Sequence, residues 1–150
     1  MISFAALANN PTGGLISPEA IALKKSAPNK RVLRILLAED NPTDQEITGK
    51  MLKMLGHCVD TVENGAEAVA AAGRVDYDLF IMDVQMPEMD GIEAVRRIRS
   101  ISGGALKVVF ATGSTPNIYR DLCFDAGGKE FVCKPLKINE LNAAIERAMM

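Results

Sequence analysis

Short runs of apolar residues alternate with segments of helical periodicity from residue 32 to the end of the chain. Most of the runs are nearly continuous in apolar residues, which is typical of strands that are buried on both faces. They predict strands over residues 32–40, 57–64, 77–83, 106–112 and 130–134. The segments that follow them predict helices over residues 44–55, 66–72, 91–100, 116–126 and 138–149.

Strands that alternate with helices in this way favour an open, doubly wound α/β fold. We therefore expect a flavodoxin-like, five-stranded parallel sheet with helices on both of its faces. Gly56 is a natural stop for the first helix, and we expect His57 at the exposed end of that helix. Gly49 lies inside the helix, where glycine costs about 1 kcal/mol relative to alanine, so it indicates close packing there.

The first 31 residues lack this regular pattern. They contain three prolines and two glycines, and they predict a tail or linker over residues 1–31 with a short helix over residues 18–25. This part carries a net charge of +3, which leaves −5 on residues 32–150, the predicted domain. We expect the basic cluster at residues 24–31 to belong to a solvated linker.

The composition narrows the class of protein. A chain of 150 residues with 48% hydrophobic and 24% charged residues fits one globular domain. No apolar run approaches the roughly 20 residues that span a bilayer, and no Lys or Arg precedes Lys24, which argues against a secretory signal. We expect a cytoplasmic protein that binds no membrane by itself. The acidic body and the aromatic content of 5% argue against direct binding of nucleic acid.

Histidine and cysteine usage excludes several kinds of site. His57 is the only histidine of the chain, which argues against a histidine-based metal site and against Ser-His catalysis. Cys58, Cys123 and Cys133 form neither a disulfide framework nor a metal-binding spacing. We expect buried, reduced thiols at these three positions.

Chemically useful groups stand at the ends of four predicted strands. Glu39 and Asp40 end the first strand, Asp83 ends the third, Thr112 ends the fourth and Lys134 ends the fifth. Each of them alone could simply mark the point where a strand reaches water. Because sites in open parallel sheets form at the carboxyl ends of the strands, we expect these groups to converge at one edge.

Such a cluster predicts a phosphoacceptor site that depends on Mg²⁺. Three neighbouring carboxylates repel one another unless a cation neutralises them. Oxygen ligands without histidine or thiolate suit a hard ion, and Mg²⁺ keeps open positions for phosphate oxygens. A carboxylate can attack phosphorus to give an aspartyl phosphate, with Mg²⁺ and Lys134 supplying positive charge. Thr112 could donate a hydrogen bond to a phosphoryl oxygen.

These segments resemble the receiver domain of two-component response regulators. The pattern D-x-x-M-P-x-M-D-G, followed at the right separation by K-P, is highly specific, and the resemblance covers about residues 32–150. It rests on four stretches: LLAEDNP (36–42), LFIMDVQMPEMDGIEAVRRIR (79–99), VVFATG (108–113) and FVCKPL (131–136).

The resemblance implies that Asp83 accepts phosphate from a histidine kinase or a histidine phosphotransfer protein. It implies that Asp40 ligates Mg²⁺ directly and that Glu39 acts mainly through water. The backbone carbonyl of Gln85 would complete the protein's share of the metal ligands.

The resemblance also assigns residues to activation. Thr112 would move toward the phosphate, and Lys134 would pair with it, with a cis peptide bond before Pro135 shaping the loop. Phe131 matches the aromatic switch position of the family. A plain core position in the fifth strand explains Phe131 equally well.

Gln85 and Ser114 occupy positions that tune the hydrolysis of the aspartyl phosphate in this family. Neither side chain is acidic, and the ability of the Gln85 amide to orient a water predicts a moderate phosphate lifetime. Gly113 follows Thr112 and predicts open access to Asp83.

Two other functions share parts of this pattern. Aspartate-nucleophile phosphatases use a similar aspartate but typically place a second acid two residues later, where this chain has Gln85. A nucleotide- or flavin-binding module needs a glycine-rich phosphate loop after the first strand, where the sequence is AEDNPTDQ. We therefore expect a signalling domain, not an enzyme, that supports only its own phosphorylation and dephosphorylation.

The sequence fits two settings for such a domain. The last predicted helix ends just before Met150, which predicts no effector domain. The chain fits a stand-alone regulator that switches its partner interactions or relays phosphate. It also fits the C-terminal receiver of a hybrid sensor histidine kinase, which DVQMPEMDG (83–91) slightly favours. That second alternative predicts a histidine phosphotransfer protein beside the first helix, docked through exposed Met51 and Leu55.

Overall fold

The computed structural model describes residues 32–103, 106–113 and 116–150. The tail or linker, the short helix and the basic cluster predicted within residues 1–31 lie outside the described residues. Ser114, one of the predicted tuning positions, also lies outside them.

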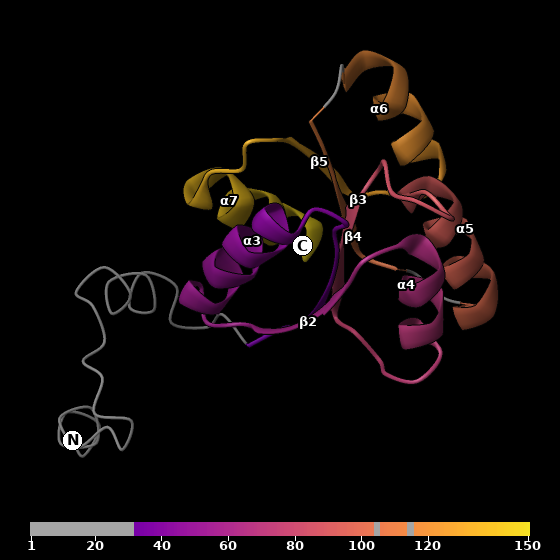
Figure 1. Cartoon of the computed structure of the whole chain (residues 1–150), viewed down its shortest axis with the longest axis horizontal. Helices are drawn as coiled ribbons and strands as arrows, with labels where there is room; N and C mark the ends of the chain where they lie inside the picture. The colour runs from indigo at the N-terminus through magenta and orange to yellow at the C-terminus, as the bar shows by residue number, and fades with distance from the viewer. Residues whose placement is uncertain (1–31, 104–105, 114–115) are drawn as a thin grey trace, which may run out of the picture. The chain divides into compact units, whose positions relative to one another are not determined.

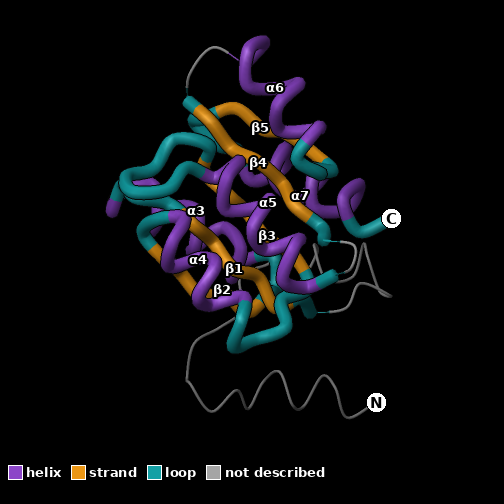
Figure 2. Tube along the Cα trace, turned by 90° about the vertical axis from the view of Figure 1, so that its right-hand side faces the viewer, coloured by secondary structure: helices purple, strands orange, loops and turns teal. Residues whose placement is uncertain are grey.

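Five parallel strands form one sheet, as predicted (Figure 1). The strand order is β2-β1-β3-β4-β5, so the chain first moves to one edge of the sheet and then returns to the other side of β1. Figure 2 shows the strands side by side in this order. The strands are β1 (Arg34–Ala38), β2 (Cys58–Val62), β3 (Leu79–Asp83), β4 (Val108–Thr112) and β5 (Glu130–Cys133). The point at which the order reverses lies between β1 and β3, where ligands bind in folds of this class.

The helices cover both faces of the sheet, with α3 and α7 on one face and α4, α5 and α6 on the other (Figure 1). They are α3 (Pro42–Met54), α4 (Gly65–Ala72), α5 (Gly91–Ser102), α6 (Pro116–Asp125) and α7 (Ile138–Ala148). The predicted doubly wound α/β fold is therefore confirmed. In the described part of the chain, every helix is too short or too polar to span a bilayer.

Helix α3 begins two residues earlier than its periodicity predicts. The Asn41 side chain accepts a hydrogen bond from the Asp44 N–H at 3.0 Å, which caps the helix. Pro42 then occupies the first turn, where its missing N–H costs nothing. Asp90 caps α5 in the same way, accepting from the Glu93 N–H at 2.8 Å. The starts of α3 and α5 are therefore fixed by cap side chains in the loops that follow β1 and β3.

The central strands are the core of the molecule. Every residue of β3 and β4 is buried, and in β1 only Arg34 is exposed. The two strands that flank the reversal of strand order, β1 and β3, are thus held rigidly from both faces. This rigidity fixes the positions at which their carboxyl ends leave the sheet.

Two predictions at the end of the first helix are wrong. His57 is buried, because the chain reverses at Gly56 (φ 94°) and His57 Nδ1 accepts a hydrogen bond from the Leu33 N–H at 3.1 Å. Leu55 is buried as well and cannot dock a partner, and Met51, the other predicted docking position, is half-buried. The exposed apolar side chains of α3 are those of Ile47 and Met54.

The cysteine prediction is correct for one of three residues. Cys123 is buried, whereas Cys58 and Cys133 are exposed, and all three are free thiols. Both exposed cysteines belong to the strands at the two edges of the sheet, which are covered less completely than the central strands.

Close packing occurs at Gly91 and not at Gly49, the glycine for which the helical pattern predicted it. A Cβ added to Gly49 would meet nothing within 4 Å, so the predicted close packing is wrong. At Gly91 an added Cβ would overlap the backbone carbonyl oxygen of Asp83 and lie 2.7 Å from Met82 Cγ. The Asp-Gly pair that ends the motif is therefore required where α5 starts against the end of β3.

We expect Gly49→Ala to raise the free energy of unfolding by about 1 kcal/mol, because alanine is the better helix former and the space is open. Gly91→Ala should lower it by about 1 to 3 kcal/mol through overpacking. Urea denaturation of both variants, followed by circular dichroism, measures these changes. A loss of stability in Gly49→Ala would contradict the open space at that position.

Candidate functional site

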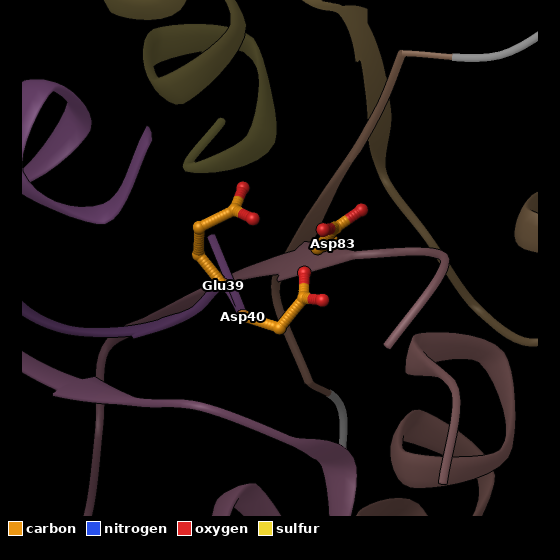
Figure 3. A group of neighbouring side chains, drawn as sticks. All are labelled: Glu39, Asp40 and Asp83. Carbon is orange, nitrogen blue, oxygen red and sulfur yellow. The ribbon is translucent and has the colours of Figure 1, made fainter. Parts of the chain in front are cut away.

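The ends of β1 and β3 bring three carboxylates together. Ala38 of β1 pairs with Met82 of β3, so Glu39 and Asp40 leave β1 beside Asp83. One ligand oxygen from each of the three residues lies within 4.8 Å of the other two. Figure 3 shows the pair from the end of β1 next to Asp83 at the end of β3. The predicted convergence of the acids is present in the structure.

The three acids differ in their exposure. Glu39 is 3% exposed and Asp83 is 5% exposed, whereas Asp40 is open to solvent. Buried carboxylates are costly unless a cation or hydrogen-bond donors compensate their charge. The cluster thus has two buried acids and one acid at its mouth, through which an ion can enter.

Lys134 supplies the positive charge inside the cluster. Its Nζ lies 2.5 Å from Glu39 Oε1, 3.1 Å from Asp83 Oδ2 and 3.6 Å from Asp44 Oδ2. The Lys134 N–H donates to the carbonyl of Thr112 at 2.8 Å, which continues the pairing of β4 and β5 up to this residue. The peptide bond between Lys134 and Pro135 is cis, as the family resemblance implies.

The acidity of the buried groups reflects this crowding. Burial raises the pKa of Glu39 to about 7, although the hydrogen bonds from Lys134 and the Asn41 N–H act in the opposite direction. Burial also raises the pKa of Asp83, with the hydrogen bond to Glu39 and the charge of Lys134 opposing it. Burial lowers the pKa of Lys134, but its hydrogen bonds to both acids and their charges raise it on balance. The cluster therefore favours an additional cation.

The donor atoms of this cluster fit Mg²⁺. All three are carboxylate oxygens, without histidine or thiolate, which is the ligand type of a hard divalent ion. Among the described residues, this is the one such group of three potential ligands. Gln85 lies beside it, since the Gln85 N–H donates to Asp83 Oδ1 at 3.3 Å.

The remaining predicted residues line the strand ends next to the cluster. Asp83 pairs with Ala111, so Thr112 lies one position beyond it on β4, almost completely buried. Gly113, after it, is exposed, which fits open access. Phe131 of β5 is partly buried and packs against the core cluster of α4, α5 and α6. Its two predicted roles, switch and core residue, are both compatible with this packing.

The loop between β3 and α5 is tied to the start of α4. Asn64 Nδ2 donates to Glu88 Oε2 at 3.1 Å, and the Gly65 N–H donates to the Met89 carbonyl at 3.1 Å. Glu88 has a φ of 67°, an uncommon backbone state for a residue with a side chain. The Gly91 N–H closes the loop by donating to the Val84 carbonyl at 2.9 Å. These contacts fix the loop that follows Asp83.

Sequence analysis did not identify two residues at this site. Asp44 faces Lys134 from the first turn of α3, and the Asn-Pro cap that starts the helix is the signal that could have placed it there. Tyr119 of α6 accepts a hydrogen bond from Gln85 Nε2 at 3.0 Å. No sequence signal relates Tyr119 to Gln85, which lies 34 positions earlier in the chain.

Comparison with known proteins shows the same family along most of the chain. Residues 35–146 match the model of the response regulator receiver domain. The chain is 35% identical over 127 residues to hybrid signal transduction histidine kinase L of Dictyostelium discoideum. That match covers 80% of this chain but 7% of the kinase, so the chain spans a small part of this relative.

Solved structures agree with this assignment. The receiver domain of sensor histidine kinase PA1611 from Pseudomonas aeruginosa, which has a magnesium ion in its active site cleft, is 35% identical. It superposes with a TM-score of 0.73 over 79% of this chain and 98% of that domain. A CheY-like receiver domain from Methanospirillum hungatei, 21% identical, shares the fold with a TM-score of 0.73 over 79% of this chain and 94% of its own.

The family match, the strand order and the acidic cluster therefore agree. The chain belongs to the response regulator receiver domain family, a signalling module of two-component systems.

Proposed function

We propose that residues 32–150 form a phosphoacceptor domain in which Asp83 is phosphorylated in a Mg²⁺-dependent reaction. The observation that carries this proposal is the position of Asp83 between the ammonium of Lys134 and the acidic pair at the end of β1. A carboxylate held in this way has a fixed nucleophilic oxygen and a nearby positive charge. The domain supports its own phosphorylation and dephosphorylation and no other catalysis.

The residues of the cluster would have different roles in phosphoryl transfer. An oxygen of Asp83 forms the bond to phosphorus while the bond from phosphorus to the donor's nitrogen or oxygen breaks, and the donor keeps that electron pair. Asp40, Asp83 and the Gln85 carbonyl would hold Mg²⁺, with Glu39 acting through water. When bound, Mg²⁺ supplies positive charge to the phosphoryl oxygens. Lys134 then pairs with the phosphoryl group.

The neighbouring positions on β4 and β5 are proposed to report the phosphorylated state. The Thr112 hydroxyl would donate to a phosphoryl oxygen and draw the end of β4 toward it. Phe131 has no hydroxyl, so any change in its position is driven by packing. Gln85 and Ser114 would tune the hydrolysis that resets the domain.

The partner that phosphorylates Asp83 is proposed to be a histidine kinase or a histidine phosphotransfer protein of the cytoplasm. The similarity to receiver segments of hybrid histidine kinases supports this class of partner. A phosphotransfer protein would dock beside α3, which borders the site and exposes Ile47 and Met54. The same contact serves a stand-alone regulator and a hybrid-kinase receiver.

Incubation with acetyl phosphate and Mg²⁺ tests the phosphoacceptor. Intact-protein mass spectrometry should show the gain of one phosphoryl group in the wild type, no gain with EDTA and no gain in Asp83→Asn. Asp76→Asn makes the same chemical change at an exposed position before β3 and should retain full labelling. An undiminished adduct in Asp83→Asn, or none in the wild type, would refute the proposal.

The affinity for Mg²⁺ should fall as the pH is lowered from 8 to 6. The pKa of Glu39 is raised to about 7, so at pH 6 a proton must leave the cluster when the metal binds. We expect roughly tenfold weaker binding at pH 6 than at pH 8, measured by isothermal titration calorimetry. Glu39→Gln should bind Mg²⁺ with a smaller dependence on pH in this range. Equal wild-type affinities at both pH values would contradict the raised pKa.

A further inference from the structure

The side chain of Gln85 is held by a residue outside the acidic cluster. Gln85 Nε2 donates to the Tyr119 hydroxyl at 3.0 Å, which links the loop after β3 to helix α6. The backbone N–H of Gln85 donates in turn to Asp83 Oδ1 at 3.3 Å. One residue therefore connects the phosphoacceptor carboxylate with α6, through its main chain on one side and its side-chain amide on the other.

Of the two partners of this hydrogen bond, Tyr119 is held by packing more firmly than Gln85 is. Tyr119 is partly buried, and its ring packs against the core cluster beneath α5 and α6. Gln85 is exposed, and a long exposed side chain samples several rotamers unless a partner holds it. Tyr119 therefore helps to hold the amide in place, and a movement of α6 would change its position.

The Gln85 amide is bonded to Tyr119 beside a hollow that the acidic cluster does not line. Gln85 and Tyr119 both line a hollow of about 250 Å³ between α5 and α6, large enough for several water molecules. The hollow is also lined by Val84 and Asp90 of the loop after β3, by Ile92, Glu93 and Arg96 of α5, and by Leu122 of α6. Glu39, Asp40 and Asp83 are not among the lining residues. An amide bonded to Tyr119 thus faces this hollow.

We propose that Tyr119 is a positioning residue that prolongs the life of the aspartyl phosphate by withholding the Gln85 amide from the attacking water. The inference rests on the proposed function of Asp83. In the hydrolysis, a water oxygen forms a bond to phosphorus while the bond from phosphorus to the Asp83 oxygen breaks. The electron pair returns to the carboxylate, and the water's proton leaves with inorganic phosphate or solvent. An amide that orients this water accelerates the step.

Tyr119→Phe tests the proposal because it removes the hydroxyl and keeps the ring that packs on the core. After labelling with acetyl phosphate and removal of the reagent, the loss of the phosphoryl group is followed by mass spectrometry. We expect decay about three- to tenfold faster than in the wild type, the factor that one ordinary hydrogen bond corresponds to. The rate at which acetyl phosphate labels Asp83 should stay the same, so the extent of labelling at saturation should fall only because the phosphoryl group is lost faster.

A double-mutant cycle separates this role from a general loosening of the fold. In a Gln85→Ala background, Tyr119→Phe should leave the decay rate unchanged, because the amide that it would release is absent. Tyr77→Phe is the matched control. Tyr77, which precedes β3, is the other tyrosine of the chain, and its hydroxyl donates to Asp60 at 2.7 Å. This variant should decay at the wild-type rate.

The outcomes distinguish the phosphoacceptor role of Asp83 from the positioning role of Tyr119. A wild type that takes up no phosphoryl group refutes the proposed function and this inference with it. If labelling occurs, an unchanged or slower decay in Tyr119→Phe overturns the role of Tyr119 alone. The same acceleration with and without Gln85 also overturns it, since the effect would then not pass through the amide.

Discussion

The ammonium of Lys134 between two buried carboxylates is the interaction on which the rest of the site depends. Glu39 and Asp83 are almost inaccessible to water, and two such charges close together are costly without a cation. Lys134 follows β5, which lies at one edge of the sheet, so the carboxyl end of β5 must align with those of β1 and β3. The parallel sheet provides this alignment, because all of its strands end on one side.

One lysine cannot neutralise the whole cluster. It faces Glu39, Asp83 and Asp44, while Asp40 lies at the mouth. The remaining negative charge would attract a divalent ion, and under the proposed function a phosphoryl group would add charge that the ion and the lysine share. The fold thus places excess negative charge at the reversal of strand order, and a bound cation would neutralise it.

The sequence was sufficient to predict the parts that depend on local pattern. Continuous apolar runs identified the strands, and the chemical types at their ends identified Glu39, Asp40, Asp83 and Lys134, because a parallel sheet aligns strand ends without further information. Ends of elements were less certain, since caps such as Asn41 extend a helix beyond its periodic segment.

The errors arise where tertiary contacts decide the environment. His57 was placed on the surface from its position after a helix, but the turn at Gly56 directs it beneath Leu33. Cys133 looked like a core residue of a strand, yet its strand lies at the sheet edge. The contact of Gln85 with Tyr119 joins two elements whose relative placement no local pattern encodes.

The closed loop between β3 and α5 has a consequence for changes in chain length. Surface loops usually accept inserted residues, because their ends can move apart without breaking the core. Here the ends are joined by the hydrogen bond from Gly91 to Val84, and the middle is pinned by Asn64 and Gly65 at Glu88 and Met89. Because the loop is held at these points, an inserted residue would have to displace the end of β3. The hydrogen bonds at both ends and in the middle therefore constrain the length of this loop.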